Sequence, residues 1–372
     1  MSVVRFDQIA RECRETFKGS FEGKPIVGLE HIEPYDMLLK NYDVDVETTF
    51  TKSFKKGQIL FGRRRAYQHK ACVATIDGIC SGDITVIEPI EGKVYPDLLP
   101  FIIQNDDFFE HAIKGSNGAL SPRVKWEHIA NFELDLPSLA EQKVLAEKLW
   151  AAYEVKQSYL KMIAATEEMV KAQFIEMFFK NTWKEKYLED VVSEECSLSY
   201  GIVQPGEGVE DGIPVVRPVD LVSDIVEPDC LKKTTVDIAK SYKRTTLKGG
   251  ELLLCVRGTT GLLSMASNRL NGGNVTRGIV PIWFKKDISK AFMFHQMKSD
   301  YVQTQIKENT YGTTLLQINI KDLRKIKVIL PPEDLQLKFV SFAEQADISI
   351  SELRKSVDAI DKVIKSLINE NL

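Results

Sequence analysis

Two segments in the first third of the chain carry side chains that could hydrogen-bond the bases and phosphates of a nucleic acid. In the major groove arginine most often reads guanine and asparagine or glutamine reads adenine, whereas lysine, arginine, serine and threonine commonly contact phosphate. The candidates in the first segment are Arg63, Arg64, Arg65, Tyr67, Gln68 and Lys70. The candidates in the second segment are Lys114, Ser116, Asn117, Ser121, Arg123 and Lys125. A solvated charge run is the alternative for 63–65, but its place directly after an apolar strand favours contact with DNA.

A second group of candidates lies in the latter half of the chain. Its members follow an apolar strand, occupy a glycine-flanked loop at 272–278, or form a short basic stretch. They are Arg257, Thr259, Thr260, Asn274, Thr276, Arg277, Tyr242, Lys243 and Arg244. Glycine would let the backbone of the 272–278 loop approach a phosphate closely. An ordinary tight turn, and for 242–244 a solvated surface charge, remain the alternatives.

The sequence contains no recognisable catalytic motif. It has no G-x-x-x-x-G-K-[ST] phosphate loop and no Asn/Asp-Pro-Pro-Tyr/Phe tetrapeptide of an adenine methyltransferase. Asp97, Glu141 and Lys143 could be forced into a nuclease pattern, but their spacing is long and Glu141 opens a predicted helix. The five histidines show no metal-ligand spacing. We therefore expect neither a catalytic residue nor a metal site in this chain.

The distribution of charge suits a protein that meets a polyanion with part of its surface. The net charge of the 372 residues is -4, which argues mildly against a simple nucleic-acid binder. However, the segments 54–70 and 252–286 carry several lysines and arginines and no acidic residue. Two basic stripes on an acidic background predict a polyanion on one side and protein partners on the rest.

Composition also bears on where the protein acts. The six cysteines form no C-x-x-C pair, so reduced thiols are expected. No apolar run approaches the roughly 20 residues that cross a bilayer, and the N-terminus lacks the apolar core of a signal peptide. We expect a cytoplasmic protein that does not associate with a membrane.

An internal repeat organises the chain. Residues 134–142 read LDLPSLAEQ and residues 328–336 read VILPPEDLQ, so that Pro137 matches Pro331 and Gln142 matches Gln336 at a constant offset of 194 positions. Each motif leads into a long helical pattern. A repeat that covers about half the chain implies a duplicated unit and two similar surfaces related by pseudo-symmetry.

The second helical pattern is an uninterrupted heptad seam, which is typical of a coiled coil. Its a and d positions are Phe339, Ala343, Ala346, Ile350, Leu353, Val357, Ile360, Ile364 and Leu367. The first pattern has the same register, interrupted by Lys156, Thr166 and Gln173. We predict two antiparallel helices on the order of 55 Å long that hold two globular heads apart. Ordinary core packing is the alternative.

These patterns predict an α+β fold in which two globular domains are joined by a pair of long antiparallel coiled-coil helices. The predicted segments are a first domain at 1–136, a first helix at 137–181, a second domain at 182–330 and a second helix at 331–372. Both domains contain a glycine turn followed by an apolar strand, at 54–61 and at 247–254. The polar residues directly after these strands differ. Such a combination is expected of two related binding domains with different ligands.

The order of these features resembles the specificity subunit of type I restriction–modification enzymes over the whole length of the chain. The resemblance rests on the segments 57–66 (GQILFGRRRA), 77–84 (DGICSGDI) and 120–124 (LSPRV), and on the paired Leu-Pro…Gln motifs before the helices. It implies a non-catalytic subunit with two target recognition domains, each of which reads one half of an asymmetric, bipartite DNA site. The two helices would set the spacing between the half-sites.

The same resemblance implies the partners. Double-stranded DNA, two modification (methyltransferase) subunits and restriction/translocase subunits are expected to bind this chain. S-adenosylmethionine, ATP and Mg are expected in the partner subunits, and no cofactor in this chain. The residues alone leave two other classes open: a helical protein–protein scaffold without a DNA role, and a self-contained nuclease. Salt-dependent binding of duplex DNA would distinguish a DNA-recognition subunit from the scaffold. Metal-dependent cleavage by the isolated chain would distinguish the nuclease from a non-catalytic subunit.

Overall fold

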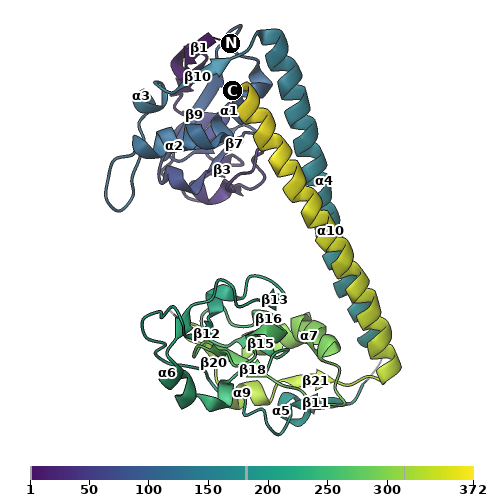
Figure 1. Ribbon diagram of the computed structural model, residues 1–372. Coiled ribbons are helices and arrows are strands. Elements are labelled where there is room, and N and C mark those ends of the chain that lie inside the picture. The colour runs from purple at the N-terminus through teal and green to yellow at the C-terminus, as the bar shows by residue number, and fades with distance from the viewer. Residues whose placement is uncertain (1, 181–182, 314) are drawn as a thin grey trace. The chain divides into compact units, whose positions relative to one another are not determined.

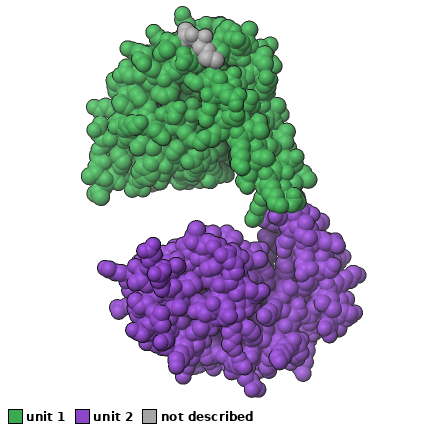
Figure 2. Space-filling view, in the orientation of Figure 1, with its two compact units in different colours: residues 1–163, 352–372 green, residues 164–351 purple. Residues whose placement is uncertain are grey.

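The computed structural model describes residues 2–180, 183–313 and 315–372 and divides into two compact units. Unit 1 contains residues 1–163 and 352–372, and unit 2 contains residues 164–351 (Figure 2). Each unit combines small β-sheets with short helices and with parts of two long helices (Figure 1). No helix among the described residues is both long and apolar enough to cross a membrane.

Unit 1 contains two four-stranded sheets and a separate strand pair. The first sheet has the order β2 (Ala10–Cys13), β9 (Ile84–Pro89), β6 (Ile59–Gly62) and β7 (Ala71–Val73). The second has the order β4 (Asp43–Val44), β3 (Pro25–Val27), β8 (Gly78–Cys80) and β5 (Lys52–Phe54). The pair is β1 (Ser2–Arg5) with β10 (Glu133–Leu136), and the helices are α1 (Leu99–Gln104), α2 (Asp106–Lys114) and α3 (Trp126–Ile129).

Strand β6 of unit 1 is buried on both faces. Because successive side chains of a strand point to opposite faces, its residues contribute to two different cores. Ile59 and Phe61 pack into the core that contains the phenylalanines of α2. Leu60 packs into a second core with residues of the other sheet, such as Val27. This explains why the predicted strand at 59–61 is a continuous apolar run and not an alternating one.

Unit 2 repeats the arrangement with one strand fewer in its second sheet. Its largest sheet has the order β13 (Ile225–Val226), β16 (Leu263–Ala266), β15 (Leu252–Cys255) and β18 (Ile279–Ile282). A second sheet has the order β14 (Lys233–Thr234), β12 (Ile213–Val216) and β17 (Asn274–Val275). Two strand pairs join β19 (Thr310–Tyr311) to β20 (Gln317–Ile318), and β11 (Glu185–Tyr187) to β21 (Lys327–Ile329). The helices are α5 (Leu188–Val191), α6 (Val236–Ser241), α7 (Lys290–Lys298), α8 (Asp300–Glu308) and α9 (Ile320–Arg324).

The strand pairings confirm the internal repeat. In unit 1, β6 pairs antiparallel with β7 and β9, while β3 pairs parallel with β8. In unit 2, β15 pairs antiparallel with β16 and β18, while β12 pairs parallel with β17. The strand before each long helix also pairs with the first strand of its unit, as β10 with β1 and β21 with β11. The predicted α+β fold with two related globular domains is therefore correct.

The two long helices are α4 (Leu139–Phe178) and α10 (Glu333–Asn371). Their entries repeat in side-chain detail. The Gln142 side-chain amide donates to the carbonyl of Pro137 at 2.9 Å, and the Gln336 amide donates to the carbonyl of Pro331 at 2.7 Å. Both helices lie inside the ranges predicted from the heptad pattern, and the predicted boundary between 181 and 182 falls outside the described residues.

Within unit 1 the two helices run antiparallel. The Lys156 ammonium lies 2.6 Å from the carboxylate of Asp361. Leu145 and Leu149, which precede Lys156, belong to one core with Ile368, which follows Asp361. Within unit 2, the rings of Phe174 and Phe178 on α4 contact Phe339 on α10, with centroids 5.1 and 5.7 Å apart. Every predicted a and d position of α10 is buried or half-buried. The spacing that the helices would impose on two half-sites stays a prediction.

Candidate nucleic-acid interface

The structure brings the two candidate segments of unit 1 side by side. The backbone N–H of Arg65 donates to the carbonyl of Pro122 at 2.8 Å, and the N–H of Val124 donates to the carbonyl of Arg63 at 2.9 Å. The loops at 62–70 and 114–125 therefore form one continuous surface, although more than forty residues separate them in the chain. We call this surface the unit 1 loop cluster.

An acidic residue that the sequence analysis did not single out lies within this cluster. The Asp83 carboxylate accepts hydrogen bonds from Arg123 Nε at 2.6 Å and Nη2 at 3.3 Å, and from Arg64 Nη1 at 3.3 Å. Burial raises the pKa of the Asp83 carboxyl, but the hydrogen bonds and charges of Arg123 and Arg64 outweigh it and hold the pKa below its ordinary value. Ser121 accepts from Arg64 Nη2 at 3.0 Å and completes the network.

The arginines of this cluster retain unused donors. The Nε atoms of Arg63, Arg64 and Arg65 are buried and have no hydrogen-bond partner in the described part of the chain. Arg65 adopts left-handed backbone angles (φ 56°, ψ 53°), which cost non-glycine residues energy and occur often at functional sites. Because these Nε atoms are buried, a ligand would reach them only if the loops rearrange.

The other candidates of unit 1 differ in how free their side chains are. Tyr67 is 52% exposed, and Gln68 lies next to it on the same short 3₁₀ turn. The Lys70 ammonium donates to the carbonyl of Leu29 at 2.6 Å, and Ser116 donates to the carbonyl of Ala112 at 2.9 Å. Lys114 forms an ion pair with Glu110, Asn117 donates to the carbonyl of Gly115, and Lys125 is exposed at the start of α3. Tyr67 and Lys125 are thus freer for a ligand than Lys70 or Ser116.

Unit 2 builds the same loop framework from different residues. The N–H of Gly258 donates to the carbonyl of Leu316, as that of Arg65 does to Pro122, both at 2.8 Å. The N–H of Val256 donates to the carbonyl of Gly278 at 2.8 Å, as that of Arg63 does to Asp83 at 2.9 Å. The matching hydrogen bonds and strand registers show that three pairs of residues occupy equivalent positions in the two units. The pairs are Arg64 and Arg257, Asp83 and Gly278, and Arg123 and Gln317.

We call the residues around Arg257 the unit 2 loop cluster. Arg257 is half-buried, and its side chain forms no ion pair with any described residue. Thr259 is exposed, while Thr260 accepts a hydrogen bond from Thr310 at 3.2 Å. Thr276 donates to the carbonyl of Val216 at 3.4 Å. The Arg277 side chain is exposed, and its backbone N–H donates to Ile202.

Asn274 is placed differently from the exposed loop position that the sequence suggested. Its side chain is fully buried, accepts from the Thr245 hydroxyl at 2.7 Å and donates to the carbonyl of Tyr242 at 3.2 Å. The amide therefore has an internal structural role, because β17 begins at this residue and enters the core. Lys243 and Arg244 are exposed and Tyr242 is half-buried, next to this network.

Comparison with known proteins identifies the family. Residues 181–359 match the type I restriction modification DNA specificity domain. The chain is 26% identical over 291 residues to the type I restriction enzyme EcoBI specificity subunit of Escherichia coli, with 68% of this chain and 61% of that subunit covered. It is 22% identical over 405 residues to the putative type I restriction enzyme MjaX specificity subunit of Methanocaldococcus jannaschii, with 99% and 90% covered. Residues 181–359 thus belong to the type I DNA specificity domain family, and the chain as a whole is similar to type I specificity subunits.

Solved structures of type I specificity subunits share the fold of this chain. The S subunit of a type I restriction–modification system from M. genitalium aligns with a TM-score of 0.55 and 13% identity, covering 99% of this chain and 94% of that one. A chain from a structure described as "Structural basis underlying complex assembly and conformational transition of the type I R-M system" aligns with a TM-score of 0.56 and 16% identity, covering 100% and 97%. These likenesses support the fold that the strand pairings describe.

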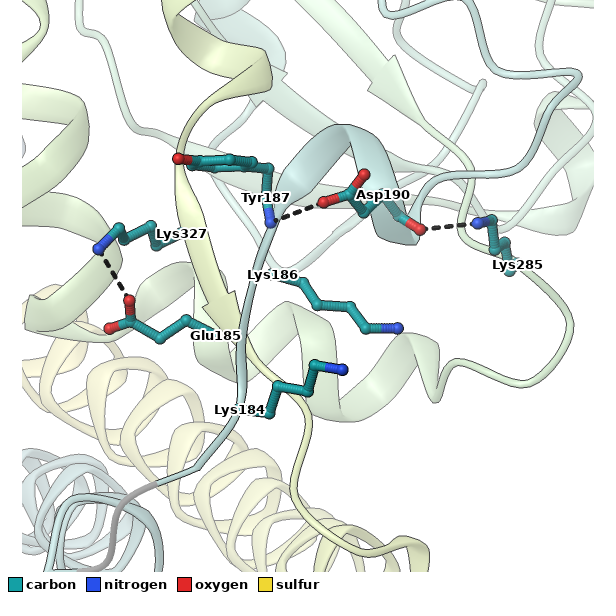
Figure 3. A pocket seen from close by; sticks show the side chains of 7 residues that line it. All are labelled: Lys184, Glu185, Lys186, Tyr187, Asp190, Lys285 and Lys327. Atoms are coloured by element: carbon teal, nitrogen blue, oxygen red, sulfur yellow. Dashed lines mark hydrogen bonds and ion pairs between the residues drawn. The ribbon is translucent and has the colours of Figure 1, made fainter.

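A lysine-rich pocket of about 640 Å³ lies elsewhere in unit 2 (Figure 3). The Lys327 ammonium lies 2.8 Å from the Glu185 carboxylate, and the Lys285 ammonium donates to the carbonyl of Asp190 at 2.7 Å. Lys285 follows the end of β18, whereas Gly278 of the unit 2 loop cluster precedes its start. The pocket is thus at the opposite end of the strand from the loops. Among the described residues, no group of three or more histidine, cysteine, aspartate or glutamate side chains could hold a metal ion.

Proposed function

We propose that this chain is the non-catalytic DNA-recognition subunit of a type I restriction–modification enzyme and reads a bipartite, asymmetric site. One observation carries the proposal: both units place an arginine, Arg64 or Arg257, at the same point of the same loop framework. Arginine delivered from a fixed loop can bond the guanine edge in the major groove. The neighbouring residues differ between the units, as two half-sites of different sequence require.

Other parts of the chain and its partner subunits would have distinct roles in this function. Exposed lysines and arginines such as Lys125, Lys243 and Arg277 would contact phosphates and set the register of each unit on the duplex. The two long helices would set the distance between half-sites and provide the surface for two methyltransferase subunits. Adenine methylation with S-adenosylmethionine, and translocation and cleavage with ATP and Mg, would belong to the partner subunits. We place this assembly in the cytoplasm.

The test is to express this chain with its neighbouring methyltransferase in a host that lacks adenine methylation of its own. Methylated adenines are then mapped across the genome. We expect methylation only within a two-part motif with a fixed gap, and no methylation when this chain is omitted. The double variant Arg64→Ala/Arg257→Ala should still co-purify with the methyltransferase but should methylate few or no sites.

Two other results would contradict the proposal. If no methyltransferase co-purifies and the chain still binds other proteins, the scaffold alternative is favoured. If the isolated chain cleaves duplex DNA in the presence of Mg²⁺, the nuclease alternative is favoured. Binding of duplex DNA that weakens steeply with salt is expected under the proposal, because phosphate contacts release counterions.

A further inference from the structure

The two loop clusters share a framework but differ at one charged position. Asp83 of unit 1 corresponds to Gly278 of unit 2, and Arg123 corresponds to Gln317. Unit 1 therefore has two arginines and a carboxylate where unit 2 has one arginine and no carboxylate. An added Cβ at Gly278 would lie 2.6 Å from Pro218 Cγ, so unit 2 has no room for a side chain at this point.

The Asp83 carboxylate fixes both guanidinium groups of unit 1. Its Oδ1 atom accepts from Arg123 Nε at 2.6 Å, while its Oδ2 atom accepts from Arg123 Nη2 and from Arg64 Nη1, both at 3.3 Å. The Arg64 group is further held by Ser121 at 3.0 Å. Because two bonds reach each arginine, neither guanidinium can turn freely about its own side chain.

Backbone hydrogen bonds also hold the loops of unit 1 together, independently of this carboxylate. The loops are already joined by backbone hydrogen bonds from Arg65 to Pro122 and from Val124 to Arg63. The backbone carbonyl of Asp83 accepts from the N–H of Arg63 at 2.9 Å, and the backbone N–H of Asp83 donates to the Ser81 hydroxyl at 3.2 Å. The Arg64 and Arg123 side chains remain 37% and 44% exposed, and ion pairs at such exposure contribute little to folding stability.

We propose that Asp83 is a specificity-determining residue, which orients Arg64 and Arg123 as a fixed pair of donors toward base edges and keeps both from binding phosphate. The inference rests on the proposed function of the chain. The Asp83 carboxylate binds some of the N–H groups of Arg64 and Arg123. The remaining N–H groups of each guanidinium then point in a defined direction, as hydrogen bonding to a base edge requires. It also cancels part of the local positive charge, so this surface gains less from any phosphate that it meets. Unit 2 would read its half-site with Arg257 in the absence of such an orienting group.

The experiment uses the full-length chain in the complex that it forms with its methyltransferase. Duplexes with a random region are selected for binding to the wild-type complex and to the variant Asp83→Asn, which keeps the shape of the side chain and removes its charge. The matched control is Asp229→Asn, because Asp229 also holds an arginine, Arg269, by two hydrogen bonds of 2.8 and 2.7 Å. Arg269 follows the end of β16, whereas Arg257 of the unit 2 loop cluster precedes its start.

For Asp83→Asn we expect discrimination at one half-site to fall by about tenfold, the value of one good bidentate base contact. The other half-site should be selected as in the wild type, which shows that the complex is folded. Affinity for a duplex without the site should rise, and the slope of log affinity against log salt should steepen by about one to two, because freed arginines then bind phosphate. Asp229→Asn should leave the selected motif unchanged.

A purely structural role for Asp83 would weaken binding to all duplexes, and that result would overturn the inference. The inference also fails if the motif and the salt slope of Asp83→Asn both equal those of the wild type. If the wild-type complex itself selects no motif, the proposed function is wrong, and this outcome is distinct because it appears before any variant is compared.

Discussion

The ammonium group of Lys156 on α4 lies 2.6 Å from the carboxylate of Asp361 on α10, within unit 1. Lys156 is one of the three polar residues that interrupt the first heptad seam. Its partner Asp361 lies on the facing helix, so this polar seam residue forms an ion pair between the two helices. A polar residue at a seam position can set the register of two helices at some cost in stability.

Loss of this ion pair should change stability only slightly. Because the two side chains are 21% and 47% exposed, we expect a coupling energy of about 0.5 kcal/mol between Lys156→Met and Asp361→Asn. A double-mutant cycle from urea unfolding measures it, and high salt should reduce it. A coupling energy above about 3 kcal/mol would mean that the pair behaves as a buried one.

Phe339 should be a major contributor to the stability of unit 2. Its side chain is fully buried and contacts the rings of Phe174, Phe178 and His295. We expect Phe339→Ala to lower the free energy of unfolding by about 3–5 kcal/mol, because a large buried ring leaves a cavity. Ile348→Ala on the same helix is the control: Ile348 is 65% exposed, so its loss should be nearly neutral in the same denaturation assay.

Stability at low pH should depend on His295 in α7. Burial, the largest cause, and the Lys298 charge lower the pKa of this imidazole to about 4, against a smaller opposing effect of Asp224. Since an unfolded histidine titrates near 6.5, protonation favours the unfolded chain. The associated stability is present above about pH 6.5 and is lost as the pH falls toward 4, by on the order of 2–3 kcal/mol. Urea unfolding near neutral pH and near pH 4.5 should show a smaller loss for His295→Gln than for the wild type; equal losses would contradict the assignment.

The cysteines should differ strongly in reactivity. Cys230 is exposed, whereas Cys72, Cys80 and Cys255 are buried. Burial raises the pKa of the Cys80 thiol to about 12, with Lys52 offsetting part of the rise, and burial also raises the pKa of Cys72 and Cys255. The thiolate is the reactive form, so labelling of the native protein should begin with a fast phase at Cys230. The variant Cys230→Ser should lack that phase, and its persistence would assign the phase to another thiol, with the half-buried Cys13 and Cys196 as the first candidates.

Arg257 should act on one half-site only. We expect Arg257→Gln to reduce discrimination there by about 1–3 kcal/mol, the usual value of a bidentate arginine contact. Arg269→Gln removes the same charge from a residue held by Asp229 and is the matched control. Methylation maps of the two variants with their methyltransferase provide the measurement. A uniform loss of methylation with an unchanged motif would assign Arg257 to phosphate contact.

The helices and the duplication could be predicted because their signals are local. The heptad positions from Phe339 to Leu367 repeat at fixed spacing, and each of them is buried or half-buried. The motif that starts each helix places a glutamine, Gln142 or Gln336, in the same hydrogen bond. Both signals lie within a few residues of the structure that they predict.

The details of the candidate interface depend on contacts that the sequence does not reveal. Arg64 and Arg123 meet because two loops pair far from each other in the chain. The sequence therefore did not indicate Asp83 as a site residue, although Asp83 lies in the 77–84 segment that supports the family resemblance. Asn274 was expected on a loop surface, but the parallel pairing of β17 with β12 places its side chain in the core. The glycine-flanked, polar sequence of 272–278 does not show whether Asn274 lies on an exposed loop or in a buried strand.

The closing of unit 1 by α10 has a consequence for synthesis on the ribosome. Ile368 belongs to the core of unit 1, whose other members lie between Phe6 and Tyr153. Unit 2, residues 164–351, is complete in the chain before residues 352–372 have been made. The part of the protein that is translated first thus finishes its core last, and a nascent chain halted before residue 352 would expose apolar side chains of Leu145 and Leu149 to chaperones.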